Sequence, residues 1–257
     1  MADFFSVLGQ AAWGHLLRER ALLAFDLDGT LAPLVPNRND ACVAADTAAQ
    51  VQALTQHWPV AVITGRSVAD ARERLGFRPH FLVGNHGAEH AGVPMSASLH
   101  AQLDSCRAQI RCQAADLQQH GIELEDKGLS LALHYAGSAH PAAALAWLQA
   151  QGALWGGAVR CLHGHRVLNV MPAAAPDKGH ALLRVFHSSG ATCALVVGDD
   201  SNDEAAFCAA PPGSVTVRIG PASTPTQARL RLRSQALVRP MLSVLLQRTQ
   251  ALQARKR

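Results

Sequence analysis

Residues 21–30 read ALLAFDLDGT, an apolar run that leads directly into two aspartates, a glycine and a threonine. A short, continuous apolar run that ends in a turn is typical of a strand buried on both faces of a parallel sheet. In such sheets, ligands bind beyond the carboxyl ends of the strands. Asp26 and Asp28 stand two residues apart, so we expect both on one side of the chain at that edge.

Strand-like runs alternate with helical patterns toward both ends of the chain. Further buried strands are expected in PVAVITGR (59–66) and CALVVGDD (193–200), and strands also in HFLVG (80–84) and SVTVRIG (214–220). Helices are expected at about 46–57 and 68–75, from Asn202 onward, and along the tail from 226. Strands that alternate with helices predict an α/β fold with a doubly wound parallel sheet.

The middle of the chain has a different pattern. Helices are expected over 98–119 and 141–151, and a pair of strands follows each one. The pairs are ELEDK with LSLALHY and AVRCLH with RVLNVM, the second pair turning at Gly164. Helix, two strands, helix, two strands is a compact α+β unit. We therefore expect an inserted domain over 92–172, with the main domain formed by 1–91 and 173–257.

The composition excludes several classes of protein. The chain has 257 residues, 49% hydrophobic and 16% charged, which suits one or two globular domains and excludes a disordered or collagen-like chain. No apolar run approaches the roughly 18 residues of a membrane-spanning helix. The six cysteines have no metal or disulfide spacing. The first 20 residues lack the features of a signal peptide and predict an amphipathic helix with one shared face: Phe4, Leu8, Ala12 and Leu16. The expected compartment is the cytoplasm.

The charges are unevenly distributed. The formal net charge is +4, but residues 1–204 hold 14 basic and 19 acidic groups, a net of −5, and the basic excess lies in the tail. No aromatic residue follows Phe207, so the tail lacks stacking platforms and no nucleic-acid partner is expected. Only three of the 23 basic residues are lysines: Lys127, Lys178 and Lys256. A lysine inside the fold therefore suggests a specific requirement.

Other predicted strand ends also carry polar groups. Thr64, Gly65 and Arg66 follow one strand, and a hydroxyl with backbone amides at a helix start suits a phosphate oxygen. Four carboxylates follow another strand: Asp199, Asp200, Asp203 and Glu204. The helix dipole would account for one or two of them. All four within six residues repel one another unless a cation binds, and such oxygen ligands suit Mg²⁺.

Lys178 lies at a predicted helix start, where a lone ammonium is unfavourable. A nearby anion would remove this penalty, which suggests contacts to a phosphoryl oxygen and an aspartate. Together these groups predict phosphoryl transfer through an aspartyl-phosphate. Asp26 is expected to attack phosphorus, Asp28 to act as general acid and then base, and Thr64 with Lys178 to stabilise the equatorial oxygens.

The expected metal is Mg²⁺, which would neutralise charge between Asp26 and the phosphate. Its ligands would be Asp26, the backbone carbonyl of Asp28, and Asp199. Asp203 would bind metal-bound water or orient Lys178.

The four strand-end motifs, in this order, resemble those of the haloacid-dehalogenase-like (HAD-like) phosphatase superfamily. They are DLDGT (26–30), Thr64, Lys178 and GDDSNDE (198–204). The insert lies between the second and third motifs, where that superfamily has its larger type of cap domain. The resemblance implies a HAD-like, Rossmannoid catalytic core and a cap that determines substrate specificity.

Within that superfamily, the chain resembles the trehalose-6-phosphate phosphatase family. The shared stretches are DGTLAP (28–33), TGR (64–66), GNHGAE (84–89), EDKGLSLALHY (125–135), GDDSNDEAAF (198–207) and TPT (224–226). The resemblance implies hydrolysis of trehalose 6-phosphate, a small sugar phosphate, to trehalose and phosphate as the last step of trehalose biosynthesis. The substrate-binding residues would be Gly65, Arg66, Asn85, His86, Glu125, Lys127 and Asn169.

Two departures from the family pattern leave the sugar open. Asn169 and Met171 stand in VLNVMP where the family usually has an acid and a base, and Ala136 stands where it usually has Arg. An amide can bind a sugar hydroxyl, but it is neutral. A HAD-type phosphatase for another sugar phosphate, of the sucrose-phosphate or mannosyl-phosphoglycerate type, is thus an alternative.

A catalytically silent regulatory or binding module is a further alternative. This alternative does not explain why the predicted catalytic and metal-binding residues are all present: Asp26, Asp28, Lys178 and Asp199. A dinucleotide enzyme is not expected, because no GxGxxG follows any predicted strand. The sequence predicts no oligomeric state.

Overall fold

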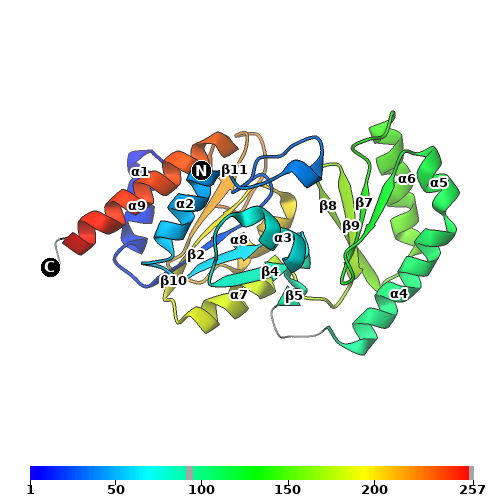
Figure 1. Ribbon diagram of the computed structural model, residues 1–257, viewed down its shortest axis with the longest axis horizontal. Coiled ribbons are helices and arrows are strands. Elements are labelled where there is room, and N and C mark those ends of the chain that lie inside the picture. Colours follow the sequence, from blue (N-terminus) through cyan, green and yellow to red (C-terminus); the bar gives the residue numbers. More distant parts are fainter. Residues whose placement is uncertain (91–94, 255–257) are drawn as a thin grey trace. The chain divides into compact units, whose positions relative to one another are not determined.

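The computed structural model describes residues 1–90 and 95–254. The chain divides into two compact units (Figure 1). The first, here called the core unit, comprises Met1–Gly87 and Asp177–Arg257. The second, the cap unit, comprises Ala88–Pro176, rather than the 92–172 expected from the sequence pattern.

A parallel sheet forms the centre of the core unit. Its neighbouring strands follow the order β1-β12-β11-β10-β2-β3-β4. Their bounds are Ala2–Asp3 (β1), Ala21–Phe25 (β2), Val60–Ile63 (β3), Phe81–Gly84 (β4), Cys193–Gly198 (β10), Val215–Ile219 (β11) and Leu230–Leu232 (β12). From β2 the chain proceeds through β3 and β4 in one direction, and β10 to β12 extend in the other. The strand order thus reverses between β2 and β10, and a ligand site is expected at such a switch point.

Helices cover both faces of this sheet. They are α1 (Val7–Leu16), α2 (Ala45–Leu54), α3 (Val68–Leu75), α7 (Lys178–Ser189), α8 (Glu204–Ala209) and α9 (Val238–Ala254), with short 3₁₀ turns at Arg38–Asp40, Asn85–Gly87, Ser201–Asp203 and Gln235–Leu237. Leu23 and Phe25 belong to the hydrophobic core that includes α1, α2, α3 and α9. Leu22 and Ala24 belong to the second core, with α7 and α8. Successive side chains of β2 therefore point alternately into the two hydrophobic cores, one on each face of the sheet. This arrangement confirms the predicted doubly wound α/β fold.

The N-terminal prediction needs correction. The helix begins at Val7, and Ala2–Asp3 form β1, which pairs in parallel with β12. Leu8, expected on the buried face, is 73% exposed, whereas Trp13 is buried. The Trp13 indole stacks on Phe4, with ring centroids 5.4 Å apart, and its Nε1 donates to the Phe4 carbonyl. Because Phe4 precedes the helix, it does not share a helical face with Leu8.

The C-terminal tail is not entirely helical either. Leu230–Leu232 form β12, which pairs with β11 in parallel. Both leucines are buried, in the alternating run RLRLR. This period of two is typical of a strand, and it outweighs the helical pattern expected from 226 onward.

The cap unit is an α+β layer. Its strands are β5 (Glu89–His90), β6 (Glu123–Asp126), β7 (Leu131–His134), β8 (Val159–Gly164) and β9 (Val167–Pro172), and its helices are α4 (Ala97–Cys112), α5 (Ala114–Gln119) and α6 (Pro141–Leu154). Strands β6-β7-β9-β8 form an antiparallel sheet in that order. The single long helix predicted over 98–119 is wrong, because the chain breaks at Gln113 between α4 and α5.

Helices α4 and α6 cover one face of the cap sheet. Leu131 and Leu133 of β7 pack with Leu103 of α4 and Leu148 of α6 in one buried cluster. Residues of the opposite parity point to the other face, which we call the second face of the cap sheet. Among the described residues, no helix is both long enough and apolar enough to cross a bilayer.

Candidate active site

Acidic side chains meet where β2 and β10 end. Asp26 follows β2 and Asp199 follows β10, and the parallel register joins them through the Asp26 N–H, which donates to the Val197 carbonyl at 2.9 Å. Asp203, from the turn after Asp199, completes the group. Carboxylate oxygens of Asp26, Asp199 and Asp203 lie within 4.8 Å of one another. The strand topology alone thus brings together residues more than 170 positions apart.

Lys178 lies within this acidic group. It begins α7, and its side chain is only 2% exposed. Its Nζ is 2.9 Å from Asp26 Oδ1 and 2.7 Å from Asp203 Oδ1. Burial alone would lower the pKa of Lys178, but the two carboxylates outweigh it and raise the pKa well above its usual range. The ammonium therefore stays charged.

Asp203 is held by the backbone as well as by Lys178. Its Oδ2 accepts hydrogen bonds from the N–H groups of Asp199 and Asp200, both at 2.9 Å. Asp199 Oδ1 accepts from the Thr30 hydroxyl at 2.8 Å. A side chain at Gly198 would place Cβ 2.5 Å from Asp203 Oδ2. Only glycine at position 198 therefore lets the Asp203 carboxylate approach the backbone this closely.

The electrostatics of the group favour a bound cation. With all three carboxylates ionised, the group and its one ammonium would carry two uncompensated negative charges in a buried place. Burial raises the pKa of Asp199 to about 7, with Asp203 adding to the shift and Thr30 opposing it. Burial likewise raises the pKa of Asp26, against the effect of Lys178. Carboxylate oxygens in this arrangement fit a hard divalent cation, which would offset the charge that the protein leaves uncompensated.

The two other carboxylates after β10 have different partners. Asp200 caps the turn at Ser201–Asp203, accepting from the Ser201 N–H at 2.7 Å. Glu204 Oε1 is 3.1 Å from Arg218 Nη1, and its Oε2 accepts from the Gln227 N–H at 2.8 Å. The expectation that all four carboxylates need a cation is therefore wrong, because two of them are satisfied by the protein.

Asp28 points to an arginine. Both of its carboxylate oxygens accept from Arg66 at 2.7 Å, from Nε and from Nη2. The turn between Asp28 and Thr30 depends on Gly29, whose φ is +80°. Arg66, which the family resemblance implies as a substrate-binding residue, is 9% exposed and directs its guanidinium to protein acceptors.

The loop after β3 is fastened to the loop after β4. The Thr64 carbonyl accepts from the His86 N–H at 2.9 Å, and the Arg66 carbonyl accepts from the Asn85 N–H at 2.7 Å. A Cβ at Gly65 would lie 2.7 Å from His86 Nε2, so the two loops are in close contact. Asn85 and His86 have φ of 47° and 56°, a conformation that non-glycine residues rarely adopt. Such backbone outliers cluster at functional sites.

Gly87 completes the second loop. Its φ is 111°, and a Cβ there would lie 2.6 Å from the carbonyl carbon of Asp177. The point where the chain leaves the core unit and the point where it returns are therefore in direct contact.

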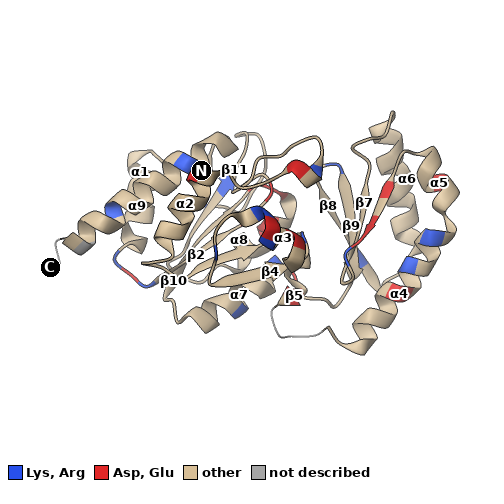
Figure 2. Ribbon diagram, viewed as in Figure 1, with Lys and Arg blue, Asp and Glu red and all other residues tan. Residues whose placement is uncertain are grey.

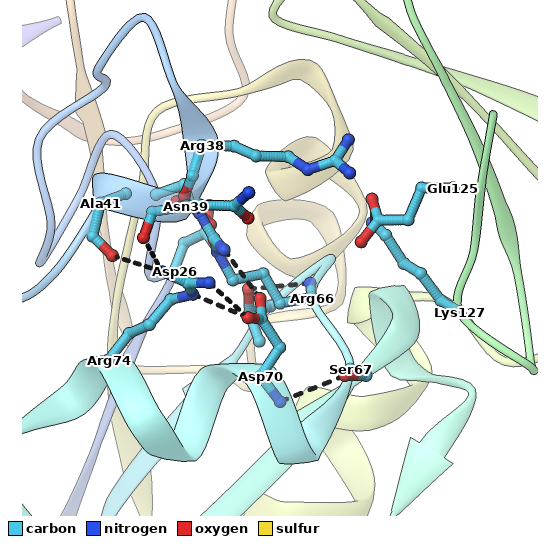
Figure 3. Close-up of polar contacts among 12 residues, drawn as sticks. Asp26, Arg38, Asn39, Ala41, Arg66, Ser67, Asp70, Arg74, Glu125 and Lys127 are labelled. Carbon is cyan, nitrogen blue, oxygen red and sulfur yellow. Dashed lines mark hydrogen bonds and ion pairs between the residues drawn. The ribbon is translucent and has the colours of Figure 1, made fainter. Parts of the chain in front are cut away.

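The three cap residues implied by the resemblance, Glu125, Lys127 and Asn169, share the second face of the cap sheet. Glu125 pairs with Ala132, and Ala132 pairs with Asn169. Glu125, Ala132 and Asn169 therefore form one row across β6, β7 and β9, which we call the Glu125 row. Lys127 Nζ is 3.8 Å from Glu125 Oε2 (Figure 3), and His134 Nε2 is 2.9 Å from the same oxygen. Asn169 Nδ2 donates to the Leu162 carbonyl at 3.5 Å.

The sequence interpretation missed Asp70 and Arg74. Asp70 stands four residues after Arg66 and four before Arg74, and Figure 2 shows acidic and basic residues side by side on α3. That spacing signals ion pairs along a helix. Burial alone would raise the pKa of Asp70, but hydrogen bonds from Arg74 and Arg66 outweigh it and hold the pKa below its ordinary value.

Comparison with solved structures confirms the fold. The C-terminal domain of the C. albicans trehalose-6-phosphate phosphatase superposes with a TM-score of 0.77 at 21% identity, over 92% of this chain and 96% of that domain. A phosphatase of the haloalkanoate (HAD) superfamily from Bacteroides thetaiotaomicron gives a TM-score of 0.58 at 15% identity, over 88% and 95%. The core is thus the predicted HAD-like core.

Sequence comparison identifies the family. A trehalose-phosphate phosphatase of Mycobacterium tuberculosis is 31% identical over 230 residues, which cover 84% of this chain and 58% of that protein. The chain therefore spans little more than half the length of the curated relatives it matches. The sequence profile of the trehalose-phosphatase family matches residues 24–236. Since that match extends over most of the sequence, the chain belongs to the trehalose-phosphatase family.

Proposed function

We propose that this chain is a Mg²⁺-dependent phosphatase that hydrolyses trehalose 6-phosphate to trehalose and phosphate, with Asp26 as the nucleophile. The observation that carries the proposal is the buried group of Asp26, Lys178, Asp199 and Asp203 at the carboxyl ends of β2 and β10. Membership of the trehalose-phosphatase family supports the choice of substrate.

Two displacements at phosphorus complete the reaction. In the first, an Asp26 oxygen forms a bond to phosphorus while the bond from phosphorus to the sugar oxygen breaks, and Asp28 gives its proton to that oxygen. In the second, water attacks the aspartyl-phosphate, Asp28 takes the water proton, and the bond to Asp26 breaks to release phosphate. Lys178 and Thr64 bind the phosphoryl oxygens as negative charge develops on them.

Mg²⁺ would be held by Asp26, by Asp199 and by the backbone carbonyl of Asp28. When bound, the ion supplies positive charge between the nucleophile and the phosphate. Asp203 acts indirectly in this scheme: it orients Lys178 at 2.7 Å and fixes the backbone of Asp199 at 2.9 Å.

The two units divide the work in this proposal. The core supplies the phosphoryl chemistry, while Glu125, Lys127 and Asn169 of the cap bind the sugar. Gly65, Asn85 and His86 contribute to the substrate site from the core. We further propose a cytoplasmic enzyme, where its cysteines remain thiols, that acts on small sugar phosphates rather than on nucleic acid or membranes.

The test is phosphate release from a panel of sugar phosphates, with and without Mg²⁺. Wild type should prefer trehalose 6-phosphate to glucose 6-phosphate and should need the metal. Asp26→Asn should lower kcat by a factor on the order of 10³ or more, as loss of a nucleophile does. Full activity of this variant would refute the nucleophile assignment.

A second candidate is the same chemistry on another sugar phosphate. Asn169 favours it, because a neutral amide lies in the Glu125 row where the family resemblance implies an acid. If sucrose 6-phosphate or mannosyl-phosphoglycerate is hydrolysed faster than trehalose 6-phosphate, this candidate replaces the first.

A further inference from the structure

The carboxylate of Asp28 is held by a chain of ion pairs. Arg66 donates to both Asp28 oxygens at 2.7 Å and, through Nη1, to Asp70 Oδ2 at 2.7 Å. Asp70 Oδ1 in turn accepts from Arg74 Nη2 at 2.6 Å and Nε at 2.8 Å. Two aspartates and two arginines therefore alternate from the end of β2 to the second turn of α3.

Backbone groups fasten this chain at several points. Arg66 Nη2 donates to the Arg38 carbonyl at 2.8 Å, and Arg74 Nη1 donates to the Asn39 carbonyl at 2.5 Å (Figure 3). The Asp70 N–H donates to the Ser67 hydroxyl at 3.2 Å, which caps α3. The acid on α3 is thus fixed by its own helix, and the loop around Asn39 is tied to the same network.

The Arg66 guanidinium uses most of its hydrogen-bond donors within this network. Its guanidinium makes four hydrogen bonds to protein acceptors, and a guanidinium has only five N–H groups. A side chain so committed has little capacity left for a sugar hydroxyl. Its evident effect is to fix where the Asp28 oxygens lie.

We propose that Asp70 is a positioning residue for Asp28: it holds the Arg66 guanidinium in the one orientation that directs the Asp28 carboxylate, while Arg74 secures Asp70. The proposal rests on the proposed function, in which Asp28 moves the proton. It requires no contact between Asp70 and substrate. The step that depends on it is proton transfer to the leaving oxygen as the phosphorus–oxygen bond breaks.

The dependence on the leaving group distinguishes positioning from a general structural role. A sugar alkoxide needs a proton to leave, whereas the phenolate of p-nitrophenyl phosphate leaves without one. Asp70→Asn should therefore lower kcat/KM for trehalose 6-phosphate about tenfold, since correct placement of a general acid contributes about 10²–10⁴ in rate. For p-nitrophenyl phosphate, kcat/KM should fall by less than about threefold, since its first step needs no acid.

Matched variants complete the experiment. Asp46→Asn removes an exposed aspartate that pairs with Arg239 at 2.9 Å outside the network, and it should leave both substrates unaffected. Asp70→Glu should restore part of the loss. Arg74→Gln, which keeps the contact between Asp70 and Arg66, should give the same pattern with a smaller amplitude and serves if Asp70→Asn does not fold.

Two outcomes overturn the proposal: an equal loss on both substrates, or no loss on either. Failure of the proposed function would look different. If the wild type with Mg²⁺ hydrolyses neither ester, the chain is not a phosphatase. If it hydrolyses p-nitrophenyl phosphate but not trehalose 6-phosphate, the test is repeated with whichever alkyl phosphate of the sugar panel is turned over.

Discussion

The two lysines inside the fold lie in very different surroundings, one in each unit. Lys178 of the core lies between two carboxylates at 2.9 and 2.7 Å and is 2% exposed. Lys127 of the cap is 3.8 Å from Glu125, beyond hydrogen-bond distance. A buried ammonium between two acids is part of the structure of the site. The Lys127 ammonium, at the turn after β6, is instead proposed to bind the sugar.

Loss of the Lys178 ammonium should give the largest effect on stability. In Lys178→Ala, the carboxylates of Asp26 and Asp203 stay buried without their cation, so the free energy of unfolding should fall by about 3–5 kcal/mol. Urea denaturation in the presence of a chelator measures this. Lys178→Arg should also impair turnover, because the larger planar group has to fit a site built around a point charge. A change below about 1 kcal/mol for the alanine variant would contradict the comparison.

Replacement of Lys127 should affect binding rather than stability. Lys127→Ala should lower the free energy of unfolding by less than Lys178→Ala does, because Lys127 Nζ is 3.8 Å from Glu125, whereas Lys178 Nζ lies within 2.9 Å of two carboxylates. Its KM for trehalose 6-phosphate should rise about tenfold, a loss of about 1.4 kcal/mol of binding, with kcat less changed. Lys127→Arg should impair turnover to a smaller extent. Steady-state kinetics on trehalose 6-phosphate, with p-nitrophenyl phosphate as the control substrate, would measure these changes in KM and kcat. A fall in kcat on both substrates with KM unchanged would place Lys127 in the chemistry instead.

A single substitution in the Glu125 row sharpens the role of the cap. Asn169→Glu introduces the acid that the family resemblance implies at this position, and hydrogen bonds to a charged acceptor contribute about 1.5–3 kcal/mol compared with about 0.5–1.5 for a neutral one. We expect kcat/KM for trehalose 6-phosphate to rise several-fold. Asn169→Gln, which adds length without charge, is the control. A decrease with Glu would indicate that this row binds a different sugar.

The smallest expected effect is on how steeply the free energy of unfolding falls at acid pH. Asp70 in the core and Asp126 in the cap are each paired with arginine, and these hydrogen bonds outweigh burial and lower the pKa of both carboxylates. A lowered folded-state pKa stabilises the protein above the unfolded value near 3.8, and this stability is lost as pH falls through the folded pKa. Asp70→Asn and Asp126→Asn should each flatten the fall in stability below about pH 4, as measured by urea midpoints. A fall as steep as that of wild type would show that the pairing contributes nothing to acid stability.

Much of the core follows from contiguous residues. Strands β2, β3, β4 and β10 each form a short apolar run, and the ends of β2, β3 and β10 carry the acidic and hydroxyl groups on the same segment. Parallel topology then brings those ends to one edge of the sheet without further information. The sequence pattern therefore predicts that Asp26, Thr64 and Asp199 meet at one edge.

Long-range partners could not be predicted in the same way. The spacing along α3 indicates that Arg66 and Asp70 pair, but not that Arg66 reaches Asp28, 38 residues away. The partners of Glu204 are Arg218 and Gln227, on segments that only the fold brings close. The break between α4 and α5 at Gln113 has no glycine or proline to signal it. These features depend on tertiary packing, which local pattern does not encode.

The contact between Gly87 and Asp177 has a consequence for the origin of this architecture. The chain leaves and re-enters the core at adjacent backbone positions, so a short linker can join them without moving β4 or α7. Domains whose ends lie close together tolerate insertion. A different inserted domain could therefore replace the cap unit at this junction without displacing the strands of the core.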